Sequence, residues 1–238
     1  MYKLYHGDCL EIMDQIEDKS VDMILCDLPY GTTNCKWDSI IPFEPLWNQY
    51  NRVIKDNGAI VLFSTQPFTT TLIYSNLKNY RYNWYWKKNI ITGFSYARYQ
   101  PMRTIEDICV FFFFSGKYNP IGMKKSSDPI RIRNDKNGIN SEALNKAYKP
   151  RYTGYPNNLL FFNKEFGYHP TQKPVALLEY LIKTYTNESE IILDNCMGSG
   201  STGVACINTN RRFIGIEKED KYFEIAKERI EKKVKSEK

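Results

Sequence analysis

The stretch that decides the fold is EIILDNCMGSGSTGVACINTNRRFIGIE, residues 190–217. An apolar run leads into a glycine-containing turn, an amphipathic segment expected to be helical over 200–208, a second apolar run at 212–216, and then Glu217. Glycines such as Gly198 permit a tight turn and a close approach of the backbone to a ligand, and the helix that follows offers free N–H groups. A carboxylate at the end of the next strand can accept hydrogen bonds from both hydroxyls of a ribose. The stretch therefore predicts a nucleoside-binding unit.

The same alternation of apolar strands and amphipathic helices extends outward from this stretch, which predicts an α/β protein with a parallel sheet. Strands are expected at 2–5, 21–26, 59–63, 82–86, 108–114, 190–193 and 212–216. Helices are expected at 9–16, 44–53, 68–77, 174–185, 200–208 and 220–234, the second of them ended by Asn57 and Gly58. From 87 to 167 regularity falls away except at 108–114, which predicts a long loop or an inserted subdomain.

A second motif, DLPY at residues 27–30, follows the expected strand 21–26. The carboxyl ends of parallel strands face the ligand crevice of such a sheet. There the Asp27 carboxylate and nearby carbonyl groups can accept hydrogen bonds from an exocyclic amine, and the Tyr30 ring can stack on the attached base. Pro29 fixes its own φ and favours an extended Leu28, so the cluster is pre-set. The alternative is an Asx-type turn capped by a surface tyrosine.

The charge of the chain is unevenly distributed. Its 238 residues carry 33 basic and 27 acidic side chains, a net charge of +6. Residues 81–168 hold 15 basic and 6 acidic side chains, a net charge of +9, interleaved with many tyrosines and tryptophans. Such a segment suits a phosphate backbone and exposed bases. The alternative is a solvated lysine-rich surface over an aromatic core.

The composition excludes several classes of protein. A content of 42% hydrophobic and 25% charged residues is that of a globular chain, not of a disordered or fibrous one. The sequence has neither an apolar run of membrane-spanning length nor an apolar core in its first ten residues, so we expect a cytoplasmic protein with no membrane partner. The six cysteines lie far apart without a CxxC pair, which favours buried free thiols over a metal site or a disulfide framework.

The glycine turn also satisfies G-x-G-x-x-G at Gly198, Gly200 and Gly203, which is a dinucleotide-binding pattern. Too few residues follow Gly203 to form the second half of a doubly wound dinucleotide domain. The remaining alternative is a tight glycine turn beside a solvated glutamate.

Taken together, these motifs resemble those of the S-adenosylmethionine-dependent DNA amino-methyltransferases. DLPY at 27–30 is similar to that family's D/N/S-P-P-Y catalytic motif, and DNCMGSGST at 194–202 resembles its cofactor loop. HPTQKP at 169–174 resembles its H-P-x-x-K-P segment beside the methionine part of the cofactor. HGDC at 6–9 resembles its G-D segment near the adenine, and IGIE at 214–217 is similar to the strand end that holds the ribose.

The order of the motifs implies an architecture. The catalytic motif precedes the cofactor loop, with a long insertion between them, as in the circularly permuted beta group. The resemblance thus implies a single Rossmann-like methyltransferase sheet with helices on both faces. Residues 1–86 would form the catalytic half, 87–167 an inserted basic target-recognition region, and 168–238 the cofactor-binding half of the same domain.

The resemblance also assigns candidate site residues. The catalytic candidates are Asp27, Leu28, Pro29 and Tyr30. The cofactor-binding candidates are Asp8, Cys9, His169, Thr171, Lys173, Asp194, Cys196, Gly198, Ser199, Gly200, Ser201, Thr202 and Glu217. The candidates for DNA contacts are Lys87, Lys88, Arg98, Arg103, Lys124, Lys125, Arg131 and Arg133.

The implied activity is transfer of a methyl group from S-adenosylmethionine to N6 of an adenine flipped out of double-stranded DNA. Cytosine N4 is the alternative target, because an aspartate opening is only more typical of adenine enzymes. An RNA or protein-glutamine methyltransferase, a non-catalytic DNA-binding module and a dinucleotide-dependent oxidoreductase are the rival functions. The resemblance also allows a homodimer and a restriction endonuclease as partners, and it implies no metal.

Four positions depart from the family pattern. Leu28 replaces the usual first proline, although its carbonyl can still accept a hydrogen bond. Asn195 and Cys196 replace the common Pro-Phe, which leaves less hydrophobic cover near the cofactor. Ile105 precedes Glu106 where His-Glu is common, so any role of that histidine is lost and Glu106 is interpreted as a fold-supporting carboxylate.

Overall fold

The computed structural model describes residues 2–32, 38–127, 131–132, 147–148, 150–168 and 172–236. The chain divides into two compact units. The larger combines Met1–Asn119 with Asn158–Lys238, and the smaller is Pro120–Asn157.

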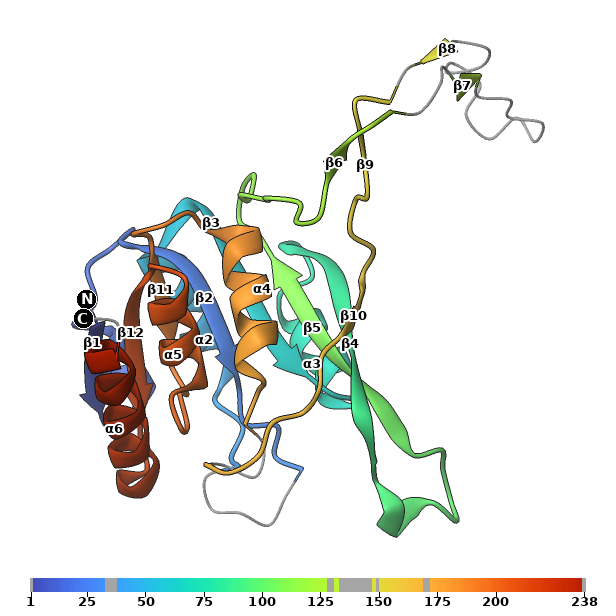
Figure 1. Cartoon of the computed structure of the whole chain (residues 1–238). Coiled ribbons are helices and arrows are strands. Elements are labelled where there is room, and N and C mark those ends of the chain that lie inside the picture. The colour runs from blue at the N-terminus through green and yellow to red at the C-terminus, as the bar shows by residue number, and fades with distance from the viewer. Residues whose placement is uncertain are drawn as a thin grey trace. The chain divides into compact units, whose positions relative to one another are not determined.

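The larger unit is built on an eight-stranded sheet in the order β1-β12-β11-β2-β3-β5-β4-β10 (Figure 1). Neighbouring strands are parallel except β5, which runs antiparallel to both β3 and β4. The strands are β1 (Tyr2–His6), β2 (Val21–Asp27), β3 (Ile54–Ser64), β4 (Tyr80–Thr92), β5 (Arg103–Phe111), β10 (Leu159–Phe161), β11 (Ile191–Asp194) and β12 (Arg212–Glu217). The predicted α/β class is confirmed.

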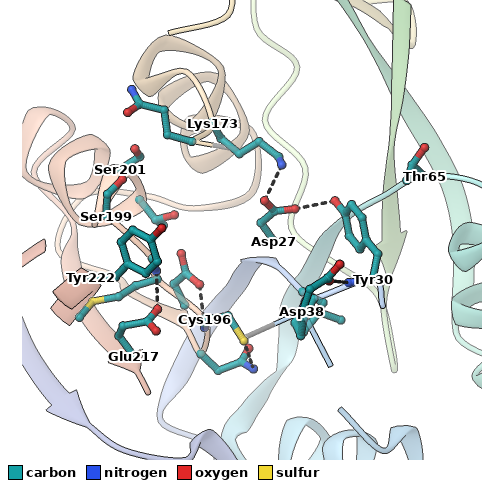
Figure 2. Close-up of a pocket in the computed structure, with 18 of the residues that line it drawn as sticks. Asp27, Tyr30, Asp38, Thr65, Lys173, Cys196, Ser199, Ser201, Glu217 and Tyr222 are labelled. Carbon is teal, nitrogen blue, oxygen red and sulfur yellow. Dashed lines mark hydrogen bonds and ion pairs between the residues drawn. The ribbon is translucent and has the colours of Figure 1, made fainter. Parts of the chain in front are cut away.

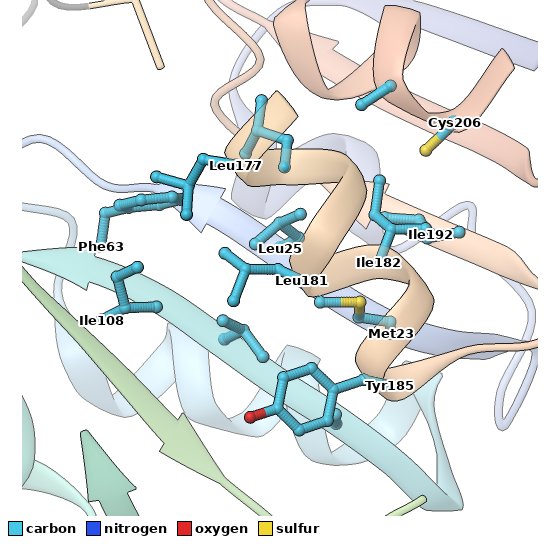
Figure 3. Close-up of a cluster of buried hydrophobic side chains, with 14 of the residues drawn as sticks. Met23, Leu25, Phe63, Ile108, Leu177, Leu181, Ile182, Tyr185, Ile192 and Cys206 are labelled. Atoms are coloured by element: carbon cyan, nitrogen blue, oxygen red, sulfur yellow. The ribbon is translucent and has the colours of Figure 1, made fainter. Parts of the chain in front are cut away.

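Helices cover both faces of this sheet, which explains why central strands such as β2 are buried at nearly every position. One face packs against α1 (Cys9–Met13), α2 (Phe43–Val53) and α3 (Phe68–Ser75). The other packs against α4 (Val175–Tyr185), α5 (Ser201–Asn208) and α6 (Asp220–Ser236). On that second face Leu177, Leu181 and Ile182 of α4 lie against Met23 and Leu25 of β2 (Figure 3).

The start of β3 differs from the sequence prediction. Asn57 and Gly58 do not end the preceding helix, because β3 begins at Ile54 directly after α2. The β2–β3 pairing shifts register between Val21 and Met23, so part of β3 bulges out. A Cβ on Gly58 would lie 2.7 Å from the Ile54 side chain and 2.9 Å from a backbone oxygen of Asp22. The glycine therefore serves this close approach.

The β4–β5 hairpin is longer than the sequence predicts. β4 continues to Thr92 and β5 starts at Arg103, so much of 87–111 is regular and belongs to the larger unit. Beyond Trp86 most hairpin side chains are exposed, and the largely buried one, Lys88, is charged, so the apolar alternation that reveals a half-buried strand is missing. A short 3-10 helix, η1 (Phe94–Tyr96), lies near its tip.

The smaller unit holds two short antiparallel pairs. β6 (Lys124–Lys125) pairs with β9 (Tyr152–Thr153), and β7 (Arg131–Ile132) pairs with β8 (Ala147–Tyr148). It occupies the centre of the segment that was expected to be irregular.

Candidate active site

A cavity of about 440 Å³ opens at the carboxyl ends of three adjacent strands, β12, β11 and β2. It is lined by the DLPY motif, residues 27–30, and by much of the glycine loop, which we define as residues 194–202. Figure 2 shows Glu217 and Tyr222 on one side of this cavity and Asp27 and Tyr30 on the other. The sheet topology thus brings together two motifs that are far apart in the sequence.

The glycine loop turns tightly against α6. Gly198 and Gly200 both adopt left-handed backbone conformations, with φ of 50° and 77°. A Cβ on Gly200 would lie 2.9 Å from the Cβ of Ala226, so no larger residue fits under α6 without a shift. A Cβ on Gly198 would meet no atom within 4 Å. Gly200 is therefore required for packing, whereas Gly198 leaves its backbone open.

Glu217 is tied to the glycine loop by its carboxylate. Its Oε2 accepts a hydrogen bond from the N–H of Gly198 at 2.8 Å, and its Oε1 accepts one from the N–H of Glu219 at 2.9 Å. Burial raises the pKa of Glu217, and these backbone donors oppose the rise. The carboxylate is thus held in one orientation at the cavity wall.

Asp194 lies buried at the end of β11, where its Oδ1 accepts a hydrogen bond from the N–H of Cys196 at 3.1 Å. Burial raises its pKa to about 7, although Thr202 and the Cys196 N–H favour the charged form. Near neutral pH this side chain therefore changes its protonation state.

Arg229 of α6 clamps the glycine loop from outside. Its Nη1 donates hydrogen bonds to the carbonyl of Ser199 at 2.6 Å and to the hydroxyl of Ser201 at 3.3 Å. Its guanidinium lies 4.1 Å from the centre of the Tyr168 ring.

A largely buried chain of charges leads away from Asp27. The Nζ of Lys173 lies 2.5 Å from Oδ2 of Asp27 and 2.9 Å from Oε1 of Glu106, and Lys88 lies 3.4 Å from Oε2 of Glu106. The side chains of Lys173, Glu106 and Lys88 are only 8%, 12% and 10% exposed. On its other oxygen, Asp27 accepts a hydrogen bond from the Tyr30 hydroxyl at 2.5 Å. The two carboxylate oxygens of Asp27 are therefore held by Tyr30 of the same motif and by Lys173 from a distant segment, and Lys173 is in turn held by Glu106.

These groups shift one another's pKa. Burial raises the pKa of Asp27; Lys173 opposes that rise and Glu106 adds to it. Burial alone would raise the pKa of Glu106, but Lys173 and Lys88 outweigh it and hold that pKa below its ordinary value. Burial would lower the pKa of Lys173, yet Asp27 and Glu106 raise it. Lys173 therefore stays charged and favours the carboxylate form of Asp27.

Asp38 fixes the backbone of the DLPY motif. Its Oδ1 accepts hydrogen bonds from the N–H groups of Tyr30 and Gly31, and its Oδ2 accepts one from Thr32, at 2.7 to 2.9 Å. Sequence reasoning missed Asp38 because no motif contains it. The only available signal is that three successive N–H groups after a strand need an acceptor.

The structure places most predicted site residues at the cavity. The catalytic and cofactor-binding candidates that line it are Asp8, Cys9, Asp27, Leu28, Pro29, Tyr30, Lys173, Asp194, Cys196, Gly198, Ser199, Ser201, Thr202 and Glu217. Lys88 and Arg103, which were predicted to contact DNA, also line it, whereas Gly200 does not and packs against α6 instead. His169 and Thr171 lie outside the described residues. Asp38, Glu106 and Asn195 also line the cavity and were not predicted as site residues.

The candidates for DNA contacts are spread over both units. Arg98 and Arg103 are exposed on the hairpin, whereas Lys88 forms an ion pair with Glu106. Lys87 lies 5.4 Å from the centre of the Phe161 ring. Lys124 and Lys125 are exposed in the smaller unit. The side chain of Arg131 and all of Arg133 lie outside what the structure describes.

Within the described part of the chain, no three His, Cys, Asp or Glu side chains are grouped so that they could hold a metal ion. Nor is any described helix long and apolar enough to cross a membrane. Cys9, Cys26, Cys109 and Cys206 are buried free thiols, as predicted.

Comparison with known proteins shows the family to which the chain belongs. Residues 21–228 match the model of the N6/N4 DNA methylase family. The type II methyltransferase M2.DpnII of Streptococcus pneumoniae is 30% identical over 252 residues, covering 96% of this chain and 89% of its own. The DNA adenine methyltransferase YhdJ of Escherichia coli is 26% identical over 246 residues, covering 96% and 82%. The crystal structure of the M1.HpyAVI–SAM complex superposes with a TM-score of 0.68 at 28% identity, covering 97% of this chain and 99% of that one.

The chain belongs to the DNA methylase family. Its sheet, with helices on both faces and ligand-lining loops at the carboxyl ends of the strands, is the Rossmann-like sheet of these enzymes.

Proposed function

We propose that this protein transfers a methyl group from S-adenosylmethionine to N6 of an adenine in double-stranded DNA. The observation that carries the proposal is that the glycine loop with Glu217 and the DLPY motif line one cavity. A ribose-accepting carboxylate and an amine-accepting carboxylate then face the same space, as transfer between two bound molecules requires.

The residues present fit the cofactor. A cavity of about 440 Å³ is within the usual range for a small-molecule site. Glu217 presents fixed carboxylate oxygens for the ribose hydroxyls, and the open backbone at Gly198 permits close approach of a ligand. When ionised, the Asp194 carboxylate can stabilise a positive charge on the ligand. S-adenosylmethionine, when bound, supplies a methyl group on a positively charged sulfur.

The DLPY motif then prepares the target amine. The amine's lone pair is delocalised into the base, so it is a poor nucleophile. Hydrogen bonds from its two N–H groups to Asp27 and to the Leu28 carbonyl favour a pyramidal, more nucleophilic nitrogen, and Tyr30 stacks on the base. The nitrogen loses a proton as positive charge forms on it. The protein contributes mainly orientation and charge complementarity.

Two observations favour adenine N6 over cytosine N4 as the target. The motif opens with aspartate, which resembles the adenine enzymes, and the relative YhdJ carries the name DNA adenine methyltransferase.

The target base lies inside a stacked duplex, so it must be flipped out, at a free-energy cost of a few kcal/mol.

Several finer assignments belong to the same proposal. The order of motifs supports the circularly permuted beta group, with 1–86 and 168–238 as two halves of one domain and 87–167 as the target-recognition region. We place the protein in the cytoplasm of a prokaryotic or phage-infected cell, where the DNA is. A homodimer and a restriction endonuclease are proposed partners, which sedimentation and a cleavage assay on modified DNA will test.

The first experiment compares Asp27→Ala with the wild type. We expect the variant to lose methyl transfer while its affinity for S-adenosylmethionine, measured by equilibrium dialysis, stays within about threefold, since Glu217 and the loop are untouched. Asp56→Ala, at an exposed ion pair with Lys19, is the matched control. Full activity of the Asp27 variant would contradict the proposal.

Two further measurements separate the rival functions. Tritium transfer to DNA, RNA and protein identifies the substrate class, and dialysis with NAD in place of S-adenosylmethionine tests the oxidoreductase. Sequencing of DNA from a methylation-free host that expresses the protein, with detection of modified bases, gives both the base and the target site.

A further inference from the structure

The tip of the β4–β5 hairpin, residues 93–102, carries large aromatic side chains that the proposed site does not use. Phe94 is 83% exposed, Tyr96 61% and Tyr99 86%. Isolated exposed rings are common on protein surfaces, but three within six residues of one hairpin tip gather into a small aromatic patch. Such a patch indicates a contact surface.

This tip lies next to the cavity. Thr92 and Arg103, which are paired with each other where the hairpin strands end, both line the cavity, as does Ile105. The residues on either side of the tip therefore form part of the cavity wall. In Figure 1 the paired strands β4 and β5 run on past the rest of the sheet to reach it. A molecule that binds the tip therefore lies next to the cavity.

The charge of the hairpin indicates which partner it fits. From 87 to 105 the chain has four basic and no acidic residues, and Arg98 and Arg103 are exposed. Lys88 is paired with Glu106, but the tip itself, 93–102, carries Arg98 and no acidic residue, and exposed rings beside a cation suit stacked bases between phosphates. A protein-binding surface gains little from such a one-sided charge.

We propose that the hairpin tip is a wedge that inserts an aromatic ring, Phe94 or Tyr99, into the DNA stack beside the target base. Apolar side chains inserted between base steps unstack them, and a ring left in the stack replaces contacts that a flipped base gives up. The proposal rests on the proposed function, because it concerns how the same base reaches the cavity.

The test uses the double variant Phe94→Ala/Tyr99→Ala and an oligonucleotide duplex that contains the target site. In one substrate the target adenine is paired, and in a second it faces an abasic position, where flipping is easy. We expect methylation of the paired substrate to fall about tenfold or more and that of the abasic substrate less than threefold. The fluorescence rise of 2-aminopurine at the target position should be lost in the same variant.

Tyr74→Ala is the matched control, because Tyr74 on α3 is 81% exposed and does not line the cavity. It should leave both rates unchanged. An equal loss on the two substrates, or no loss on either, would overturn the wedge. So would a change in sedimentation of the double variant without DNA, which would make the tip an interface between protein chains.

Failure of the proposed function is distinguishable from failure of the wedge. If the wild type methylates no DNA, the activity assignment is wrong. Fluorescence anisotropy with the same two duplexes still measures how much the tip contributes to DNA affinity. Weaker binding of the variant to the paired duplex alone supports the wedge, and equal binding of wild type and variant to both duplexes refutes it.

Discussion

Lys173 is the residue whose place in the structure adds most to its predicted role. The family resemblance puts it beside the methionine part of the cofactor, whereas its Nζ contacts Asp27 and Glu106. A buried ammonium between two carboxylates favours the ionised form of both. We therefore treat Lys173 as a positioning residue for Asp27. Glu106 opposes the effect of Lys173 on the pKa of Asp27.

This interpretation predicts opposite pH shifts for two variants. Lys173→Met removes the group that opposes the raised pKa of Asp27, so the acidic limb of the kcat–pH profile should move to higher pH by about one unit or more. Glu106→Gln removes a neighbouring negative charge, so that limb should move to lower pH. Lys173→Arg should restore part of the wild-type profile. A large loss of cofactor affinity in Lys173→Met with an unmoved profile would make Lys173 a cofactor contact instead.

Asp194 should make cofactor binding depend on pH. Its pKa is raised to about 7 by burial, so below that pH the folded protein holds a neutral carboxyl group. If a cation binds beside it, the ionised form is required, and affinity should fall up to about tenfold for each pH unit below 7. Equilibrium dialysis from pH 5.5 to 8.5 measures this. The slope should flatten in Asp194→Asn and persist in Asp56→Asn; a slope unchanged in Asp194→Asn would refute the assignment.

At the scale of elements, α6 holds the glycine loop in place by packing and by hydrogen bonds. Gly200 packs under Ala226, and Arg229, one turn further along α6, donates hydrogen bonds to Ser199 and Ser201. The helix therefore fixes the shape of a loop that belongs to another part of the chain.

Arg229→Met should loosen this loop while keeping most of the apolar side chain. Hydrogen bonds from a charged donor contribute about 1.5–3 kcal/mol, so we expect roughly tenfold or greater weakening of cofactor binding. Thermal unfolding and dialysis, compared with those of Lys227→Met on the exposed side of the same helix, separate the loop effect from helix destabilisation. Equal affinities in the two variants would show that the clamp is unimportant.

The sequence predicts the elements well wherever burial is one-sided or complete. β2, β11, β12 and α4 lie within one or two residues of their predicted bounds, because their apolar patterns reflect the core directly. The outer half of β4 and the start of β5 were missed because most of their side chains are exposed and the largely buried ones, such as Lys88 and Glu106, are charged, so no apolar alternation remains.

The same physical limit applies to the site. Motifs that are local in sequence were found, but the Asp27–Lys173 contact joins residues 146 positions apart, and Glu106 reaches it from a third segment. No spacing of residues in the sequence predicts this contact, because it depends on the order of the strands in the sheet.

At the scale of the whole molecule, the positive charge divides unequally between the two units. Pro120–Asn157 holds eight basic and three acidic side chains, a net charge of +5, so the other 200 residues carry only +1. A small unit with this charge, inserted in the chain between β5 and β10, is suited to phosphate contacts.

Joint replacement of Lys124, Lys125, Arg131 and Arg133 by Ala should therefore weaken DNA binding and flatten its salt dependence. The slope of log K against log salt should decrease in magnitude by about 0.9 for each replaced side chain that neutralises a phosphate. Binding is measured by anisotropy at several salt concentrations. The control replaces Lys3, Lys227, Lys232 and Lys235, which are exposed on β1 and α6, with the same change in net charge. An identical loss of slope in both variants would mean that only the total charge matters, and an unchanged slope in the first would move the DNA surface to another part of the protein.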